Sequence, residues 1–240
     1  MKMQIETIVG LSLLLSVLFC GCIQPGCIQG SGNYLAENRT VDDFSSIGFS
    51  SAGEVYLSQG PKHLRIEAED NIIAGLMADV SGGRLTIRHT AACINPHKPI
   101  KIYVSTPHIE GLDISGSGSI TGLSPIESDA FRIDVSGSGD INLDVNCKDL
   151  SMTISGSGSA VLRGLAADNS VDISGSGAVH GYDLKTNRST VRISGFGTAE
   201  VSVYDELYTQ ISGSGSVSYK GHPAMTSQEI SGSGSVIHEF

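Results

Sequence analysis

Tryptophan is absent from this chain, and aromatic residues make up only 5% of its 240 residues. A conventional core of large interlocking side chains is therefore not expected. Basic residues are also few: the formal net charge is −10, and no cluster of lysine and arginine exceeds two or three residues. Because a protein that binds the phosphate backbone needs a basic face, nucleic acid is excluded as an expected partner.

No apolar run is long enough to cross a membrane. The most apolar segment covers residues 8–19, whereas a transmembrane helix needs about 20 residues. Such a run after Lys2 is typical of a secretory signal peptide. Cys22, preceded by Gly21, stands where exported lipoproteins carry their modified cysteine. We therefore expect residues 1–22 to be a signal peptide with Cys22 as lipidation site, and the mature chain to be anchored in the membrane at the cell envelope. An ordinary cleaved signal is the alternative.

Residues 23–33 follow as an expected flexible tether, because they are rich in Gly, Pro, Gln and Ser and show no apolar period. With Cys22 assigned to lipid, Cys27, Cys93 and Cys147 remain. Their odd number requires at least one free or intermolecular thiol. Cys93 and Cys147 are the pair inside the expected domain, residues 34–240, and their spacing leaves open whether they form a disulfide.

A repeated hexad dominates the rest of the chain. Ile-Ser-Gly-Ser-Gly-Ser or a close variant begins at seven positions with steps of 18 to 21 residues: Ile114, Val135, Ile154, Ile173, Ile193, Ile211 and Ile230. Apolar and polar residues alternate between the hexads, which is the period of a β-strand. A step of about 19–20 residues is too short for a βαβ unit. The repeat therefore predicts an all-β, single-domain solenoid, a parallel β-helix whose seven coils form a rod of about 34 Å.

Two residue types of the hexad have expected roles. The leading Ile or Val, and the apolar residue after the hexad, should form inward columns, while the serines form outward ladders of hydroxyl groups. The two glycines either point inward, where they let the opposite wall approach, or supply the φ > 0 conformations of a corner. Both roles are structural rather than catalytic.

The segment before the hexads keeps strand character. Residues 47–57 read as a degenerate coil, Gly82-Gly83 as a tight turn, and residues 71–77 as a helical turn with Asp70 as N-cap. Near the other end, no cap is visible after Ser235, so we expect the last coil to be covered by another chain or by the N-terminal segment.

Chemistry-bearing residues are scattered. His89, Cys93 and His97 have a spacing that suits a metal, but Pro96, Pro99 and polar neighbours favour a surface loop, so no metal site and no cofactor are expected. The Ser-Gly turns precede strands rather than the helix that a phosphate loop needs. Outward acids and tyrosines are the remaining candidates for a polysaccharide-degrading site: Asp113, Asp134, Asp144, Asp172, Tyr182, Tyr204, Tyr208 and Tyr219.

Several segments together resemble a known family. These are residues 41–47, residues 64–71, the serial Ser-Gly-Ser-Gly hexads and the closing residues 213–223. They are similar to the family called putative auto-transporter adhesin, head GIN domain, over about residues 41–236. The resemblance implies a right-handed parallel β-helix on exported, often lipid-anchored proteins without an established activity.

Seven near-identical turns offer no unique catalytic residue, so no catalytic site is assigned. Our leading hypothesis is a non-catalytic, lipid-anchored β-helix of the cell surface that acts as an adhesin or envelope scaffold. Its expected partners are the membrane, a surface glycan or an envelope protein, and a second copy bound through the C-terminal coil. The alternatives are a carbohydrate-active β-helix enzyme and a self-associating structural component of the envelope.

Overall fold

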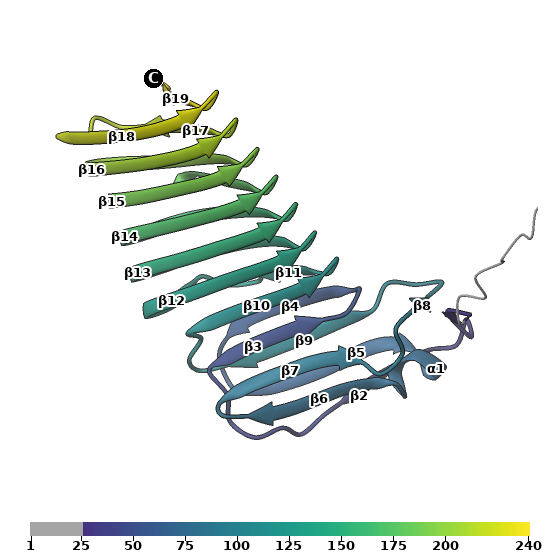
Figure 1. Cartoon of the computed structure of the whole chain (residues 1–240). Helices are drawn as coiled ribbons and strands as arrows, with labels where there is room; N and C mark the ends of the chain where they lie inside the picture. Colours follow the sequence, from purple (N-terminus) through teal and green to yellow (C-terminus); the bar gives the residue numbers. More distant parts are fainter. Residues whose placement is uncertain (1–25) are drawn as a thin grey trace, which may run out of the picture.

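The structure, a computed structural model, describes residues 26–240 and consists almost entirely of strands (Figure 1). The elements are β1 Ile28–Gln29, β2 Tyr34–Asn38, β3 Ser46–Ser50, β4 Glu54–Gln59, β5 His63–Glu69, α1 Asp70–Ile73, β6 Leu76–Ser81, β7 Arg84–His89, β8 Ile94–Asn95, β9 Lys101–Thr106, β10 Gly111–Gly116, β11 Ser119–Gly122, β12 Ile126–Gly137, β13 Asp140–Gly156, β14 Ser159–Gly175, β15 Ala178–Gly195, β16 Thr198–Gly213, β17 Ser216–Lys220, β18 Met225–Gly232 and β19 Ser235–His238. Within this part of the chain, no helix is long and apolar enough to cross a membrane.

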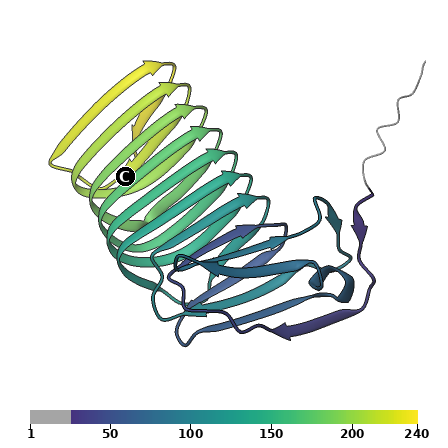
Figure 2. The same cartoon turned by 60° about the horizontal axis from the view of Figure 1, so that its bottom comes forward.

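The hexad strands stack in parallel, one coil above the next, and confirm the predicted solenoid (Figures 1 and 2). We call wall 1 the stack that ends each coil at a hexad: β3, β10, β12, the second halves of β13–β16, and β18. Wall 2 contains β4, β11, the first halves of β13–β16, β17 and β19. The hexads stay in register from coil to coil, so Ser155 lies opposite Ser136 and Ser174.

The two glycines of each hexad have different roles: the first supplies the expected φ > 0 corner, and the second points inward as expected but approaches the neighbouring coil rather than the opposite wall. The first turns the corner: Gly175 has φ +118°, and a Cβ there would lie 2.6 Å from the oxygen of Gly156. The second is buried against the core, where a Cβ on Gly177 would lie 2.5 Å from Cγ2 of Ile154. Close stacking of the coils therefore requires glycine at both places.

The core is the narrow space between the walls. It is filled by the two predicted columns, of which Ile154, Ile173 and Ile193 in wall 1 and Val179 and Ala199 in wall 2 are at most 2% exposed. The serines alternate with these residues and face solvent as the predicted ladder. Since every coil hydrogen-bonds to the coils beside it, the backbone is satisfied without large aromatic residues.

The first coil and its cover come from residues 34–106. β3 and β4 form the predicted degenerate coil, with Phe49 opposite Ile114 and Val55 opposite Ile120. Antiparallel strands then close this end: β2 and β9 flank β5, and β6 pairs with β7 around the predicted Gly82-Gly83 turn. The helix differs from the expectation, because α1 starts at Asp70, ends at Ile73, and has no side-chain cap.

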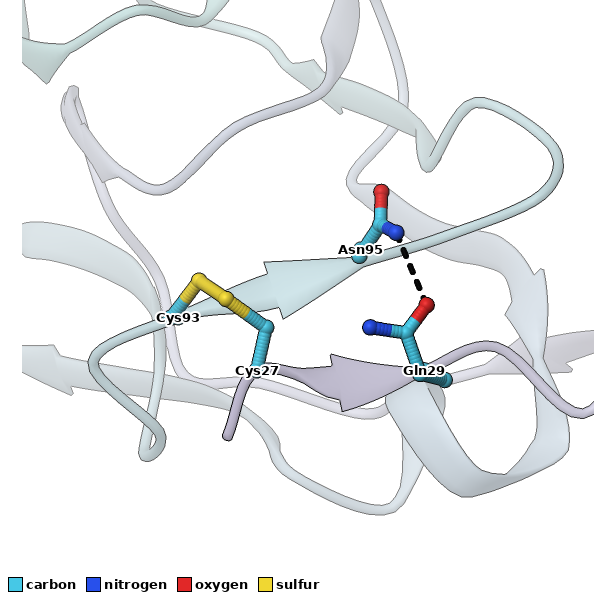
Figure 3. The surroundings of a disulfide bond; sticks show 4 residues. All are labelled: Cys27, Gln29, Cys93 and Asn95. Carbon is cyan, nitrogen blue, oxygen red and sulfur yellow. Dashed lines mark hydrogen bonds between the residues drawn. A yellow bond between two sulfur atoms is a disulfide. The ribbon is translucent and has the colours of Figure 1, made fainter. Parts of the chain in front are cut away.

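Cys93 does not form a disulfide with Cys147, the pairing that the sequence left open. Cys93 bonds to Cys27 (Figure 3). Cys147 is free. Cys147 lies within the strand stack, opposite Ser128 and Ala166. Cys93 lies in the loop beside residues 26–33, which we call the N-terminal arm. β1 also pairs with β8, so this part of the expected tether at residues 23–33 is fixed to the domain. Cys22 lies outside the described residues.

The last coil is exposed. All eight residues of β18 are accessible to solvent, and the strands that precede β3 lie at the opposite end of the rod (Figure 1). The expectation that the N-terminal segment covers this coil is therefore wrong for residues 26–38, because β1 pairs with β8 and β2 pairs with β5 at the other end of the rod.

Candidate functional site

The outer face of wall 1 carries polar side chains in straight columns. One column, three residues before each of the last five hexads, consists of Ser151, Ser170, Thr190, Tyr208 and Ser227. The neighbouring column, five residues before each of these hexads, consists of Asp149, Asp168, Arg188, Glu206 and Met225. In-register stacking brings side chains of the same offset together, although they are about 19 residues apart in the sequence.

These columns line a shallow trough along the rod. A hollow of about 730 Å³ covers both columns. A second hollow of about 610 Å³ shares Asp149 and Ser151 with the first and continues to Arg132 and Glu110. Ser151, Ser170 and Thr190 are partly exposed in the lining of the first hollow, next to the column of longer charged side chains. We call these two continuous hollows the wall 1 trough.

Ion pairs between neighbouring coils order the charged side of the trough. Arg188 donates two hydrogen bonds of 2.5 Å to the carboxylate of Asp168, and they hold the pKa of Asp168 below its usual value. Lys148 likewise donates to Asp129 at 2.8 Å and lowers its pKa. Exposed pairs of this kind contribute little stability, so their main effect is to fix the direction of the donors and acceptors.

Beside the trough, a further, mainly charged column one residue before each hexad includes three of the acids that the sequence singled out. Asp134 accepts from Arg132 at 2.5 Å, and Asp172 lies 3.6 Å from Arg192. Asp113, on the same face, pairs with Arg84 at 3.0 Å while burial raises its pKa. The remaining acid, Asp144, lies on wall 2 with Arg163 at 3.5 Å. The four acids are thus divided between the walls and engaged with arginines.

The tyrosines that the sequence singled out are also dispersed. Tyr208 belongs to the trough, where Arg192 lies 5.9 Å from its ring centroid. Tyr182 lies under Lys220, and Tyr219 stacks on His238. Tyr204 is an exposed residue of β16.

One aromatic pair was not predicted: Tyr56 and Tyr103 stack at 5.1 Å across β4 and β9. These tyrosines come from segments outside the hexad repeat, so no sequence periodicity reveals their contact. Their ring faces are turned toward each other, which makes them a poor platform for a sugar ring.

His89, Cys93 and His97, whose spacing would suit a metal, do not form a set of three free ligands, because the sulfur of Cys93 is bonded to Cys27. His97 Nδ1 lies 3.1 Å from the buried carboxylate of Glu69, and His89 Nε2 contacts the oxygen of Ile72. Among residues 26–240, no group of three His, Cys, Asp or Glu side chains is placed to hold a metal ion.

The trough itself was missed from the sequence, although a signal was present. At fixed offsets before the last five hexads, the chain has Ser-Ser-Thr-Tyr-Ser at three residues and Asp-Asp-Arg-Glu-Met at five. Charged residues recurring at one offset mark a continuous surface in a solenoid, because every offset becomes a column.

A family model describes residues 43–223, and its description is putative auto-transporter adhesin, head GIN domain. This chain belongs to that family. The match covers the first coil, most of its cover and six of the seven hexads, so it includes the wall 1 trough except for its last coil, residues 225–227. A comparison with curated proteins finds no match.

Crystal structures show the same GIN fold. A putative adhesin from Bacteroides fragilis NCTC 9343 is 23% identical with a TM-score of 0.83, and the alignment covers 88% of this chain and 100% of that one. A putative lipid binding protein from Parabacteroides distasonis ATCC 8503 is 24% identical with a TM-score of 0.74, covering 90% and 100%. A putative adhesin from Parabacteroides merdae ATCC 43184 is 22% identical with a TM-score of 0.70, covering 89% and 99%. At these identities the likeness concerns the fold.

Proposed function

We propose that this chain is a non-catalytic adhesion protein of the cell surface, and that the wall 1 trough binds an extended, hydroxyl-rich glycan chain. The observation that carries the proposal is the continuity of the trough over successive coils, from Glu110 to Met225. Membership in the GIN family supports an adhesive role.

The chemistry of the trough suits a linear glycan. Hydroxyl groups of Ser151, Ser170 and Thr190 both donate and accept hydrogen bonds, while carboxylates accept and Arg188 donates. These groups repeat at the coil spacing of about 4.8 Å. An extended polymer can use such a periodic surface over its whole length, whereas drug-sized molecules favour enclosed, mainly apolar pockets.

Anchoring by Cys22 is part of the same proposal. The disulfide between Cys27 and Cys93 is supporting evidence for export, because such bonds persist in oxidising compartments. The arm that contains Cys27 lies at the end of the rod opposite β18 and β19 (Figure 1). A lipid at Cys22 would hold that end at the membrane and direct the last coil away from it. A Cys22→Ser chain should then leave the membrane fraction without losing its fold; retention there would contradict lipid anchoring.

The trough is tested by a glycan screen with the purified protein, followed by titration of the best ligand. Ser170→Trp places an indole ring in the trough and should weaken glycan binding at least tenfold. Ser159→Trp, an outward position on wall 2, is the matched control and should bind like the wild type. Binding that survives Ser170→Trp, or silence across the screen, would overturn the glycan proposal.

A second candidate is a carbohydrate-active enzyme, because Asp149 and Asp168 are register neighbours in the trough. Adjacent strands are about 4.8 Å apart, and paired catalytic carboxyl groups are about 5–10 Å apart. The ion pair with Arg188 argues against it, since it lowers the pKa of Asp168 while a general acid needs a raised one. Loss of glycan chain length during incubation, abolished by Asp149→Asn, would favour the enzyme.

A further inference from the structure

The two ends of the rod differ in how the core is covered. At the first coil, Phe44, Ile72 and Ile73 cover the core and are at most 5% exposed. Arg39 donates to the carbonyl oxygens of Ile73 and Leu76 beside them. Residues 26–240 place no such layer over the last coil: Ile230 is 44% exposed, whereas Ile211, its partner one coil below, is 1% exposed.

The last coil also leaves backbone groups without strand partners. β18 pairs with β16, and β19 pairs with β17; within the described residues neither has a strand on its other side. Natural edge strands are often protected by charge, especially by lysine. β18 and β19 contain no Lys or Arg, and Glu229 is their one acidic residue. This edge is therefore open to further strand pairing.

The cross-section of the last coil selects what can cover it. Two strand edges lie on opposite walls, with Ile230 and Val236 between them. A single extended peptide could pair with one wall and would leave the core column uncovered. A second solenoid coil offers two strands at the same separation and an apolar column between them, which continues the coil-to-coil interface already repeated along the chain.

The second copy must present the same end, because its other end is covered by Phe44, Ile72 and Ile73. Two identical ends meet through a two-fold axis, which runs the paired strands antiparallel and closes the assembly as a dimer. A head-to-tail filament is blocked for the same reason.

The size and composition of the end suit a reversible contact. Eight residues of strand span about 26 Å, and two walls about 10 Å apart with their side chains are about 20 Å thick, so the footprint is about 500 Å² per copy. The total of about 1,000 Å² is at the low end for specific interfaces. Thr226 and Gln228 make part of this surface polar, which keeps the single copy compatible with water, and Tyr219, His238 and Phe240 add an aromatic cluster at its side.

We propose that the last coil is a homophilic contact, through which copies anchored on two facing surfaces join end to end. The pairing itself rests on β18 and β19 alone. Its action between surfaces rests on the proposed anchor at the opposite end of the rod. Glycan binding by the wall 1 trough is independent of both.

Pairing is tested by sedimentation of the purified protein over a concentration series up to about 1 mM, which detects a Kd in the millimolar range or tighter. The wild type should dimerise, with a rod about twice as long by small-angle scattering. Ile230→Lys should remain monomeric. Leu165→Lys replaces an apolar residue, 56% exposed, in the middle of the rod and should dimerise normally. A monomeric wild type, or a dimer that tolerates Ile230→Lys, would overturn the pairing.

Action between surfaces is tested with beads that carry the protein through its N-terminal end. Wild-type beads should cluster in the absence of glycan, and Ile230→Lys beads should stay dispersed. If wild-type beads stay dispersed although the protein dimerises in solution, contact between facing surfaces is refuted while the pairing stands. Loss of glycan binding in Ser170→Trp with clustering retained would separate the two functions.

Discussion

The second glycine of each hexad shows how one residue type sets the distance between neighbouring coils. Gly177 is buried, and a Cβ there would lie 2.5 Å from Cγ2 of Ile154 and 3.1 Å from the oxygen of Gly158. Gly177→Ala should lower the free energy of unfolding by about 1–3 kcal/mol, the usual effect of overpacking. The measurement is the urea midpoint, with unchanged circular dichroism to show that the fold is kept.

Gly60→Ala is the matched control, because a Cβ at Gly60 has nothing within 4 Å. That variant should equal the wild type or gain a few tenths of a kcal/mol from a less flexible unfolded chain. Equal midpoints for Gly177→Ala and wild type would show that neighbouring coils can move apart here without loss of stability.

Glu69 gives the arm a dependence on pH. Its side chain is fully buried, and burial alone would raise its pKa. Hydrogen bonds from the backbone of His97 and Gly32 and from the His97 ring outweigh burial and lower the pKa. A lowered folded-state pKa stabilises above the unfolded value of about 4.3, and this stability is lost as pH falls through the folded-state pKa.

We therefore expect the unfolding midpoint of the wild type to fall more steeply below about pH 4.3 than that of Glu69→Gln. The variant should already be less stable at neutral pH, because an amide accepts these hydrogen bonds less strongly than a carboxylate does. Parallel pH curves for the two proteins would show that the Glu69 charge has no role in stability.

At the residue scale the sequence predicts roles well wherever the repeat applies. The inward Ile and Val columns and the serine ladder follow from alternation, which a solenoid copies in every coil. Cys27 with Cys93, and Tyr56 with Tyr103, could not be predicted, because their contacts depend on how non-repeated segments fold back. Those are the places where periodicity carries no information about partners.

The coil is the unit at the element scale. Gly156 and Gly175 are in register on neighbouring coils, so deleting residues 157–175 joins equivalent positions and removes one coil. Stability of repeat proteins is nearly a sum over neighbours. The shortened chain should fold, with a rod about 4.8 Å shorter and a lower melting temperature. Its circular dichroism and scattering check this outcome; an unfolded product would show that the coils are not interchangeable.

The N-terminal arm is a separate element held by its disulfide and by β1. Because the bond closes a loop of 66 residues, its loss should reduce stability by about 2–4 kcal/mol on the chain-entropy account. In Cys27→Ser/Cys93→Ser, amide exchange should rise at Ile28–Gly30 and stay unchanged in β13–β16. Cys147 stays protonated, and therefore a poor nucleophile, at neutral pH, because burial raises its pKa to about 11. Uniform destabilisation of every coil would contradict an arm that opens by itself.

At the element scale, too, the repeated segments could be predicted from the sequence and the non-repeated ones could not. The seven coils, the degenerate coil of β3 and β4, and the Gly82-Gly83 hairpin are all visible in the sequence. The antiparallel cover of the first coil is not, since β5 must leave the parallel stack and pair with β2 and β9. The short α1 serves this cover, and tertiary packing sets its ends.

For the whole molecule, the account makes the wall 1 trough the adhesive surface of a rod. The most direct measurement is the adhesion of protein-coated beads to a surface bearing the glycan found by the screen. Every rod in this comparison, including the one called wild type, carries Ile230→Lys, which removes bead-to-bead pairing. Wild-type and Ser159→Trp rods should adhere equally, and Ser170→Trp rods should detach under the same flow. Equal adhesion of all three would contradict the central claim.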